Sequence, residues 1–449
     1  MPAPEKIVLI GAGLTGPLLA TYMAQKGFDV EIFERRYDMR KMPISAGRSI
    51  NLAVSVRGIH ALKEVGIYEE IKKIFIPMDG RIIHDLDSST RFLPYGQNNK
   101  EVINSVSRAE LNMRLMTLAE QTGRVKINFS QRCLGMDFDK KTISFFNEIS
   151  KEKTYLRADC VIGTDGSASV LRDSMEAMED HEAEYLPLGH GYKELSILPG
   201  DSGDYKLGSQ ALHIWPRGDY MLIALPNQDR SFTCTLFFPM KGDVSFESLK
   251  TRSQITSFFE QQFPDAIDLM PDVVDQYIAY PTSNLGTVRS EPWNIDDIAL
   301  IIGDAAHAIV PFFGQGMNAA FEDCTILNAM MDDYSGEWEK MFSDFSKKRK
   351  IDTDAIADMA IENYVEMRDL VNDPGFLLTK EVERKLEKKF PEKFIPRYSM
   401  VSFHRIPYAE VYARGQKQAA IVKELMEDLD REQDLNMEYA TELIEKYKV

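Results

Sequence analysis

Three glycines near the N-terminus have the spacing of a loop that binds phosphates. Gly11, Gly13 and Gly16 stand between the apolar run KIVLI, a predicted buried strand, and a helical pattern. The first glycine permits a tight turn, the second lets the backbone approach a pyrophosphate, and the third lets helix and strand pack closely. Free N–H groups and the positive dipole at the helix start would face the phosphates. We therefore predict a dinucleotide site, which also includes Leu14 and Thr15.

An acidic residue ends the next predicted strand, DVEIFE, and completes a βαβ unit. In that unit Glu34 would accept hydrogen bonds from the hydroxyl groups of an adenosine ribose. A carboxylate there repels a 2′-phosphate, so FAD or NAD is the predicted ligand rather than NADP. Arg35 follows and is placed in the same cofactor site. The alternative interpretation of the loop is a glycine-rich turn without a ligand.

Two further loops follow predicted buried strands, at residues 163–166 (GTDG) and at residues 303–318 (GDAAHAIVPFFGQGMN). Each alone could be an ordinary turn from strand to helix, but their order after the first loop is specific. Asp304 would bind a ribityl hydroxyl group, and N–H groups at a helix start would stabilise negative charge on a reduced flavin. For His307, helix capping or packing is at least as good an explanation as catalysis. The predicted cofactor residues here are Asp165, Asp304, Gly316, Met317 and Asn318.

The elements that position these loops predict an α/β fold. We expect a Rossmann-type FAD-binding domain with an inserted, mostly antiparallel β-sheet substrate domain and a C-terminal helical segment. Alternating aromatic and β-branched residues in HIWPRGDYMLIALP and SFTCTLFFP indicate the inserted sheet. The predicted boundaries are 1–75, 100–178 and 286–336 for the FAD-binding domain, 76–99 and 179–285 for the sheet domain, and 337–449 for the helical segment.

Composition excludes several classes of partner. The chain has 449 residues, with 53 Lys plus Arg against 70 Asp plus Glu and a formal charge of −17. Such a chain repels polyphosphates, so we expect no nucleic-acid partner. The four cysteines are far apart, which indicates reduced thiols in a reducing compartment, and no metal-ligand spacing occurs. No signal peptide or membrane-spanning run is present, so we expect a soluble, cytoplasmic protein.

The motifs resemble those of a known family. GAGLTG, then DG, then GDAAH with the following P, GQG and N are similar to the fingerprints of class A flavoprotein aromatic hydroxylases, typified by para-hydroxybenzoate hydroxylase. Six longer blocks resemble the kynurenine 3-monooxygenases within that group: SINLAVSVRG, PMDGRIIHD, INSVSRAELN, LHIWPRGDYMLIAL, GDAAHAIVPFFGQGMNAAFED and RYSMVSFHRIPY. This resemblance extends from the first strand to about residue 415.

The resemblance implies roles for five residues. Arg81 and Tyr95 would bind the amino-acid carboxylate of L-kynurenine, assisted by Asn363 and Tyr398, and Arg108 would lie near the flavin. An arginine suits this role because a planar guanidinium pairs with a carboxylate through two hydrogen bonds. Anchored animal and fungal members carry a C-terminal membrane segment, whereas this chain ends in the polar helix REQDLNMEYATELIEKYKV. We therefore expect no membrane anchor.

The ordinary explanations for the same residues stay open. Without the resemblance, Arg81 would more often form a salt bridge with Asp79 or Asp85. Tyr95 and Tyr398 would more often be partly buried tyrosines without a ligand, and Trp215 is more simply a core residue. The predicted pocket walls are His213, Phe312 and Phe313.

The implied reaction is hydroxylation of L-kynurenine to 3-hydroxy-L-kynurenine, in tryptophan degradation or biosynthesis of NAD. NADPH would dock transiently and reduce FAD, and O2 would then form a C4a-hydroperoxyflavin that transfers oxygen to the ring. The substrate amine already activates the ring, so no residue is assigned as a catalytic acid or base, and no metal is expected. The alternatives are a class A hydroxylase of another aromatic acid, a flavin-dependent halogenase or a non-catalytic dinucleotide-binding module.

Overall fold

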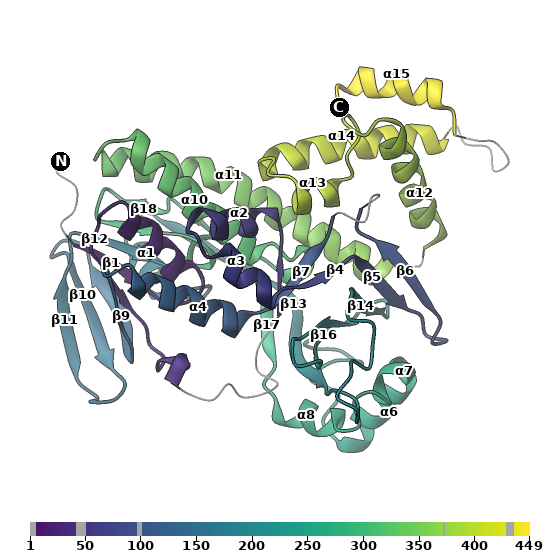
Figure 1. Ribbon diagram of the computed structural model, residues 1–449, viewed down its shortest axis with the longest axis horizontal. Helices are drawn as coiled ribbons and strands as arrows, with labels where there is room; N and C mark the ends of the chain where they lie inside the picture. Colours follow the sequence, from purple (N-terminus) through teal and green to yellow (C-terminus); the bar gives the residue numbers. More distant parts are fainter. Residues whose placement is uncertain (1–5, 42–50, 97–100, 371–372, 428–434) are drawn as a thin grey trace.

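The computed structural model describes residues 6–41, 51–96, 101–370, 373–427 and 435–449, excepting the side chains of residues 369 and 370. Ser49 and Ile50 of the SINLAVSVRG block, and the predicted domain boundaries at residues 1, 99 and 100, lie outside these ranges. The described residues form four β-sheets with helices packed around them (Figure 1).

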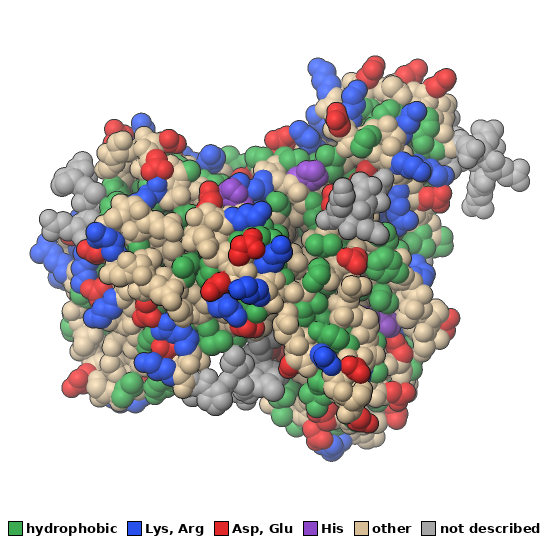
Figure 2. Space-filling model, in the orientation of Figure 1, with side chains coloured by type: hydrophobic (Ala, Val, Ile, Leu, Met, Phe, Trp, Pro, Cys, Tyr) green, Lys and Arg blue, Asp and Glu red, His purple; other side chains and the backbone are tan. Residues whose placement is uncertain are grey.

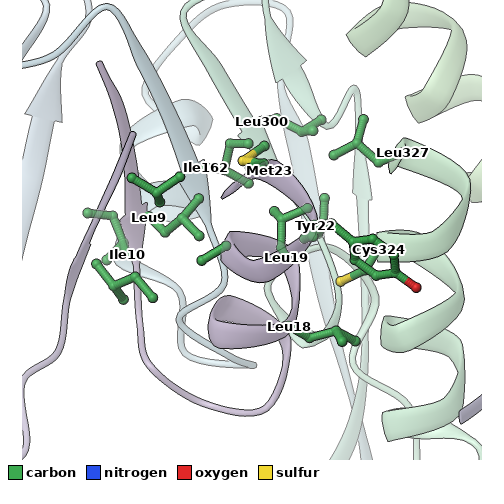
Figure 3. Close-up of a cluster of buried hydrophobic side chains, with 14 of the residues drawn as sticks. Leu9, Ile10, Leu18, Leu19, Tyr22, Met23, Ile162, Leu300, Cys324 and Leu327 are labelled. Carbon is green, nitrogen blue, oxygen red and sulfur yellow. The ribbon is translucent and has the colours of Figure 1, made fainter. Parts of the chain in front are cut away.

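A six-stranded sheet forms the nucleotide-binding part of the molecule, in the order β18-β19-β12-β1-β2-β8. All its pairs are parallel except β18 with β19. The central runs are apolar without alternation because both faces are buried. Figure 3 shows Leu9 and Ile162 of the sheet near Leu19 and Met23 of α1. The strands are β1 (Ile7–Ile10), β2 (Val30–Phe33), β8 (Val125–Asn128), β12 (Cys160–Gly163), β18 (Asn294–Ile295) and β19 (Ala299–Ile301).

A seven-stranded sheet lies beside the nucleotide-binding part, in the order β17-β13-β16-β15-β14-β5-β6. Only β14 and β5 pair in parallel, so the sheet is mostly antiparallel as predicted. One of its faces packs on α6, α7 and α8 (Figure 1). Its strands are β5 (Gly80–His84), β6 (Thr90–Pro94), β13 (Glu182–Ile197), β14 (Ala211–Pro216), β15 (Met221–Pro226), β16 (Phe232–Pro239) and β17 (Ser283–Glu291).

Two three-stranded sheets complete the β-structure, β11-β10-β9 and β3-β7-β4. Two predicted boundaries do not coincide with sheet membership. β17 belongs to the seven-stranded sheet over its whole length, although the boundary at residue 286 falls within it, and β4 pairs with β7. The three-part division itself stays a prediction. The strands are β3 (Asn51–Val54), β4 (Ile76–Met78), β7 (Ile103–Ser107), β9 (Gln131–Asp137), β10 (Thr142–Asn147) and β11 (Lys153–Arg157).

The helices before residue 334 cover the sheets. Each predicted cofactor loop connects the end of a strand to the start of a helix. β1 leads into α1, β12 into α5, and β19 into α9. These helices are α1 (Thr15–Gln25), α2 (Val56–Glu64), α3 (Tyr68–Ile71), α4 (Arg108–Gln121), α5 (Val170–Glu176), α6 (Arg252–Gln262), α7 (Pro264–Ile267), α8 (Val273–Ala279), α9 (Asp304–His307) and α10 (Gly316–Asp333).

The C-terminal part is helical, as predicted. The long helix α11 lies along the nucleotide-binding part, whereas α12, α14 and α15 gather at one end of the molecule (Figure 1). That group has its own apolar core, which includes Leu386, Ile421 and Leu443. The helices are α11 (Trp338–Val365), α12 (Pro374–Lys389), α13 (Arg397–Phe403), α14 (Tyr408–Glu427) and α15 (Met437–Tyr447).

Candidate active site

The glycine loop joins β1 to α1, and its three glycines have three different surroundings. Gly11 has a φ of +100°, and a Cβ there would lie 2.7 Å from the Thr164 carbonyl oxygen. A Cβ on Gly16 would lie 2.1 Å from the carbonyl oxygen of Gly11. A Cβ on Gly13 would meet nothing within 4 Å. Space is therefore kept free only at the glycine that a pyrophosphate approaches, and the loop fits a dinucleotide.

Glu34 lies buried at the end of β2, beside this loop. Its carboxylate accepts hydrogen bonds from the Ala12 N–H at 2.8 Å and from the Arg36 Nε at 2.7 Å. Burial raises the pKa of Glu34, but the contacts with Arg36 and Ala12 outweigh burial and hold the pKa below its ordinary value. Glu34 is thus an ionised acceptor next to the loop. Arg35 is exposed, and Arg36 is the arginine that contacts Glu34.

The two aspartates of the later motifs differ in the hydrogen bonds that their carboxylates accept. Asp165 accepts from the Ser169 hydroxyl at 2.6 Å and from the Val170 N–H at 2.8 Å, at the start of α5. Asp304, the first residue of α9, has no side-chain hydrogen bond or ion pair to another described residue. The Asp304 carboxylate is therefore available to a ribityl hydroxyl group, whereas Asp165 serves mainly to cap a helix.

The loop before α10 brings backbone N–H groups to the centre of the molecule. Gly314 has a left-handed conformation with a φ of +66°, and Gly316, Met317 and Asn318 form the first turn of α10. The Asn318 side chain accepts from the Ser55 N–H at 2.9 Å and donates to the Ala53 carbonyl at 2.8 Å. Its side chain therefore fixes this helix start against β3, and the unpaired N–H groups of the turn are what α10 offers to a flavin.

Arg81 of β5 lies beside two tyrosine rings that stack on each other. Its Cζ atom is 4.4 Å from the centre of the Tyr398 ring and 5.4 Å from the centre of the Tyr95 ring. Its Nε atom is buried and has no hydrogen-bond partner among the described residues. The alternative salt bridge is absent from the described part of the chain, where Asp85 pairs with Arg91 at 3.2 Å. Arg81 is thus a half-buried cation without a carboxylate partner.

Two aromatic rings from distant parts of the sequence contact this cation, and a third ring stacks on one of them. Tyr398 of α13 stacks on Tyr95 with 5.5 Å between ring centres, and on Phe313 with 5.4 Å. Burial keeps the pKa of the Tyr95 phenol above its ordinary value, so this hydroxyl is protonated and able to donate at neutral pH. Leu212 and Ile223 of the sheet pack on the same cluster.

Asn363 of α11 contacts the predicted pocket wall from behind. Its Nδ2 donates to the Phe312 carbonyl at 2.6 Å, and Tyr364 stacks on the Phe312 ring with 4.1 Å between ring centres. Asn363 is buried and holds the Pro311–Phe313 turn in place. The structure therefore brings Arg81, Tyr95 and Tyr398 together, whereas Asn363 contacts the backbone of Phe312 instead.

His213 is an exception, and the prediction that it lines this pocket is wrong. In the pairing of β14 with β5, Leu212 lies opposite Arg81 and His213 lies opposite Ile82. Alternate residues of a strand point to opposite faces, so the His213 side chain points away from Arg81. It contacts His84 at 2.9 Å and the Gly208 carbonyl at 2.7 Å on the face that packs on α6 to α8.

The remaining motif residues differ in their surroundings, and the prediction that Arg108 lies near the flavin stays a prediction. His307 is buried, and its Nε2 atom lies 2.6 Å from the Asp323 carboxylate, which fits the packing role rather than catalysis. Arg108 starts α4 and is exposed, and its charge partly offsets the effect of burial on the pKa of Glu194. Sequence reasoning missed Asn112, which donates to the Ala12 carbonyl at 3.2 Å and fixes the glycine loop. The sequence feature that could have identified Asn112 was its position at the end of the INSVSRAELN block.

A cavity of about 590 Å³ lies elsewhere, between α3 and α4. It is lined by residues that include Ile67, Glu110 and Arg114, and by neither the glycine loop nor Arg81. Within the described ranges, no cluster of three His, Cys, Asp or Glu side chains could hold a metal ion. No helix in that part of the chain is both long and apolar enough to cross a membrane.

Comparison with known proteins decides the family. A family profile described as "FAD binding domain" matches residues 5–338. Kynurenine 3-monooxygenase from Myxococcus xanthus is 48% identical over 440 residues, which cover 98% of this chain and 95% of that protein. The kynurenine 3-monooxygenase of Dictyostelium discoideum is 43% identical over 99% of this chain and 98% of its own. The chain belongs to the kynurenine 3-monooxygenase family of FAD-binding proteins.

Solved structures show the same fold at low sequence identity. A 2-methyl-3-hydroxypyridine-5-carboxylic acid oxygenase superposes with a TM-score of 0.66 at 17% identity, over 82% of this chain and 94% of the other. A tetracycline destructase superposes with a TM-score of 0.61 at 17% identity, over 91% of this chain and all of the other. The α/β fold with antiparallel sheet and C-terminal helices is therefore common to these proteins and the kynurenine 3-monooxygenase family.

Proposed function

We propose that this chain hydroxylates L-kynurenine at ring position 3, with FAD as bound cofactor and NADPH and O2 as co-substrates. The observation that carries the proposal is Arg81, a half-buried cation beside two tyrosine rings with no carboxylate partner among the described residues. An amino-acid substrate brings the missing carboxylate and an aromatic ring that suits these walls. Relatives named kynurenine 3-monooxygenase that align over nearly the whole chain support this substrate.

The side chains around Arg81 would bind and orient the substrate. The Arg81 guanidinium would pair with the carboxylate, and the hydroxyl groups of Tyr95 and Tyr398 would donate to the same group. Phe312 and Phe313 would form the apolar wall on the side of α10, where water is excluded from the ring. The Arg81 cluster lies on the face of the sheet opposite to His213 and His84, which leaves those histidines out of substrate binding.

The residues that would hold FAD fit that cofactor. The glycine loop and the start of α1 would bind the pyrophosphate, Glu34 the ribose, and Asp304 the ribityl chain. The first turn of α10 would bring N–H groups to the flavin ring. Bound FAD supplies the redox chemistry that activates oxygen. The four free, buried cysteines support operation in a reducing compartment such as the cytoplasm.

Mass analysis of the product tests this proposal. Purified, FAD-loaded protein is incubated with L-kynurenine, NADPH and O2, and the expected product carries one additional oxygen atom on the ring. Stimulation of NADPH oxidation by the substrate is measured in parallel. If L-kynurenine stimulated no NADPH oxidation but a benzoate or an anthranilate did, the protein would instead be a hydroxylase of another aromatic acid. That result would contradict the proposal.

A further inference from the structure

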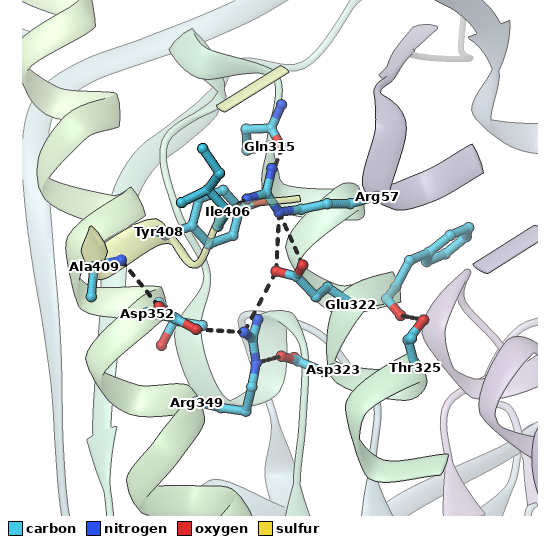
Figure 4. A network of polar contacts seen from close by, with 12 residues as sticks. Arg57, Gln315, Glu322, Asp323, Thr325, Arg349, Asp352, Ile406, Tyr408 and Ala409 are labelled. Atoms are coloured by element: carbon cyan, nitrogen blue, oxygen red, sulfur yellow. Dashed lines mark hydrogen bonds and ion pairs between the residues drawn. The ribbon is translucent and has the colours of Figure 1, made fainter. Parts of the chain in front are cut away.

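A buried network of charged side chains joins the C-terminal helices to the nucleotide-binding part (Figure 4). Arg57 of α2 lies beside Glu322 of α10. Arg349 of α11 pairs with Asp323 at 2.8 Å and with Asp352 at 3.1 Å. The side chains of Arg57 and Arg349 are 0% exposed. Charges at this depth are stable only when each is closely paired, so every contact of the network is informative.

Arg57 divides its hydrogen bonds between two distant parts of the chain. Its Nε donates to both carboxylate oxygens of Glu322 at 3.1 Å. Its Nη1 donates to the carbonyl oxygens of Val401 and His404, and its Nη2 donates to that of Ile406. Val401 lies near the end of α13, and the other two residues follow it. A helix end has carbonyl groups without intrahelical partners, and Arg57 supplies donors and positive charge there.

The helix that Arg57 holds is the helix that carries Tyr398. Tyr398 lies in the first turn of α13, and its ring covers the Arg81 guanidinium at 4.4 Å. The helix has only seven residues, from Arg397 to Phe403. A displacement of its end would therefore move Tyr398 as well, because a helix this short moves as one body.

Arg57 also lies next to the start of α10. Its Cζ atom is 3.9 Å from the centre of the Tyr408 ring. The Tyr408 hydroxyl donates to the side chain of Gln315 at 2.9 Å. Gln315 immediately precedes α10, whose first turn offers N–H groups to the flavin. One arginine therefore contacts both the segment that carries Tyr398 and, through one tyrosine, the loop beside the cofactor site.

We propose that Arg57 is a positioning residue for the substrate site. Arg57 binds the carbonyl groups at the end of α13. It thereby fixes the position of Tyr398 relative to Arg81 and to the start of α10. A lysine could not replace it, because one ammonium group cannot reach a carboxylate and three carbonyl groups in different directions. The choice of L-kynurenine as the test substrate rests on the proposed function, whereas the holding of α13 does not.

The first test compares Arg57→Lys with Arg289→Lys. Arg289 forms ion pairs with Asp354 and Asp358 of α11 and has no hydrogen bond or ion pair to described residues of α13 or of the cofactor loops, so it is a matched control. In FAD-loaded Arg57→Lys we expect the KM for L-kynurenine to rise about tenfold, with a smaller change in kcat, which corresponds to ~1.4 kcal/mol of binding. Arg289→Lys should keep the wild-type KM. A wild-type KM in Arg57→Lys would overturn the proposal.

The second test measures amide hydrogen exchange and does not depend on the substrate. In FAD-loaded Arg57→Lys, peptides that cover residues 397–408 should exchange faster than in the wild type, while peptides that cover α1 and β1 should not change. Unchanged exchange at residues 397–408, or an equal increase throughout the chain, would contradict the proposed role. If the wild type failed to hydroxylate L-kynurenine, the proposed function would fail and this exchange test would still decide the role of Arg57.

A milder variant covers the case in which Arg57→Lys does not fold. Glu322→Gln keeps the volume of the side chain but removes the carboxylate charge that orients the Arg57 Nε. We expect the same two changes, a higher KM and faster exchange at residues 397–408, with smaller amplitudes. If Glu322→Gln binds FAD and matches the wild type in both measurements, the proposal is wrong.

Discussion

Arg81 shows how one side chain can serve an anionic substrate in an acidic protein. The chain has a formal charge of −17, and Figure 2 shows both signs of charge interspersed over one face of the molecule. On that face, no broad positive surface attracts a carboxylate. A half-buried guanidinium beside aromatic rings can supply this attraction locally, because screening by water is weaker there than at the surface.

The first prediction concerns the geometry of that guanidinium. Arg81→Lys keeps the charge but loses the planar pair of donors, so kcat/KM for L-kynurenine should fall roughly 10- to 100-fold, the value of one or two hydrogen bonds to a charged group. Steady-state kinetics measures the loss, and flavin absorbance should be unchanged. Arg91→Lys, on the same hairpin, alters a partly exposed ion pair with Asp85 and should have little effect. Loss of flavin in Arg81→Lys would show that Arg81 is structural.

The second prediction concerns the free space at Gly13. In Gly13→Val the side chain would occupy the space that we assign to the pyrophosphate, so the purified protein should lack FAD. The absorbance ratio of flavin to protein measures occupancy. Gly200→Ala is the control, because its Cβ would meet its nearest neighbour at an ordinary 3.5 Å and lies in the loop after β13. Stoichiometric flavin in Gly13→Val would refute the assignment of this loop.

At the scale of elements, the two faces of β14 have different roles. One face contributes Leu212 to the cluster around Arg81, while the other carries His213 into a chain of contacts with His84 and Asp265. Trp215 donates to the same Asp265 carboxylate at 2.9 Å. These polar contacts join β5 and β14 to α7 within an apolar core, so they fix the strand from which Arg81 projects.

The third prediction concerns the pH dependence of this element. Burial, and secondarily the neighbouring His84, lower the pKa of His213 to about 4, against a hydrogen bond to Gly208 that raises it. The folded state therefore keeps His213 neutral while the unfolded state takes up a proton near pH 6.5. Its contribution to stability is complete above about pH 6.5 and is lost as the pH falls toward 4. Melting temperatures between pH 7.5 and 5 measure this loss.

A variant that lacks this one histidine isolates the effect of His213. His213→Gln should lower stability at pH 7.5 but flatten the decline toward pH 5, because glutamine does not titrate. His60→Gln, at a partly exposed position paired with Glu64, should leave the decline as in the wild type. An equally steep decline in His213→Gln and in the wild type would show that other groups are responsible.

The sequence pattern was sufficient to predict those parts of the candidate site in which the chemistry requires a fixed local spacing. The glycine loop, Glu34 and the start of α10 are each defined by neighbours within a few residues, and Arg81, Tyr95 and Tyr398 followed from blocks of sequence similar to a known family. The prediction for His213 was wrong because a single step along a strand reverses the direction of the side chain. The Arg57 contacts could not be predicted, since Glu322 and Ile406 lie 265 and 349 residues away and no periodicity links them.

At the scale of the whole molecule, the described residues form several separate apolar cores. The core of the six-stranded sheet and the core of α12, α14 and α15 share no buried residue. A third apolar core packs Val411 of α14 with Phe312 and with Ala319 of α10. The buried charged network is one connection between the two regions, through the end of α13 and the start of α14.

The fourth prediction follows from this separation. Leu443 is buried in the C-terminal core, so Leu443→Ala should destabilise that group of helices by about 2–5 kcal/mol. Hydrogen exchange should accelerate in α12, α14 and α15 while flavin content and exchange in α1 stay at wild-type values. Leu86→Ala, at a position that is 54% exposed, is the control. Flavin loss in Leu443→Ala would show that the cores are coupled.

The order of strands in the parallel sheet also affects how the chain folds during its synthesis. β1 pairs with β2, which follows at once, and with β12, which begins at residue 160, while β19 ends at residue 301. On a translating ribosome, one edge of β1 must wait on the order of ten seconds for its partner strand. During that interval an apolar strand edge is open to pairing with other chains. Yield in cells should therefore depend on chaperones that cover nascent chains.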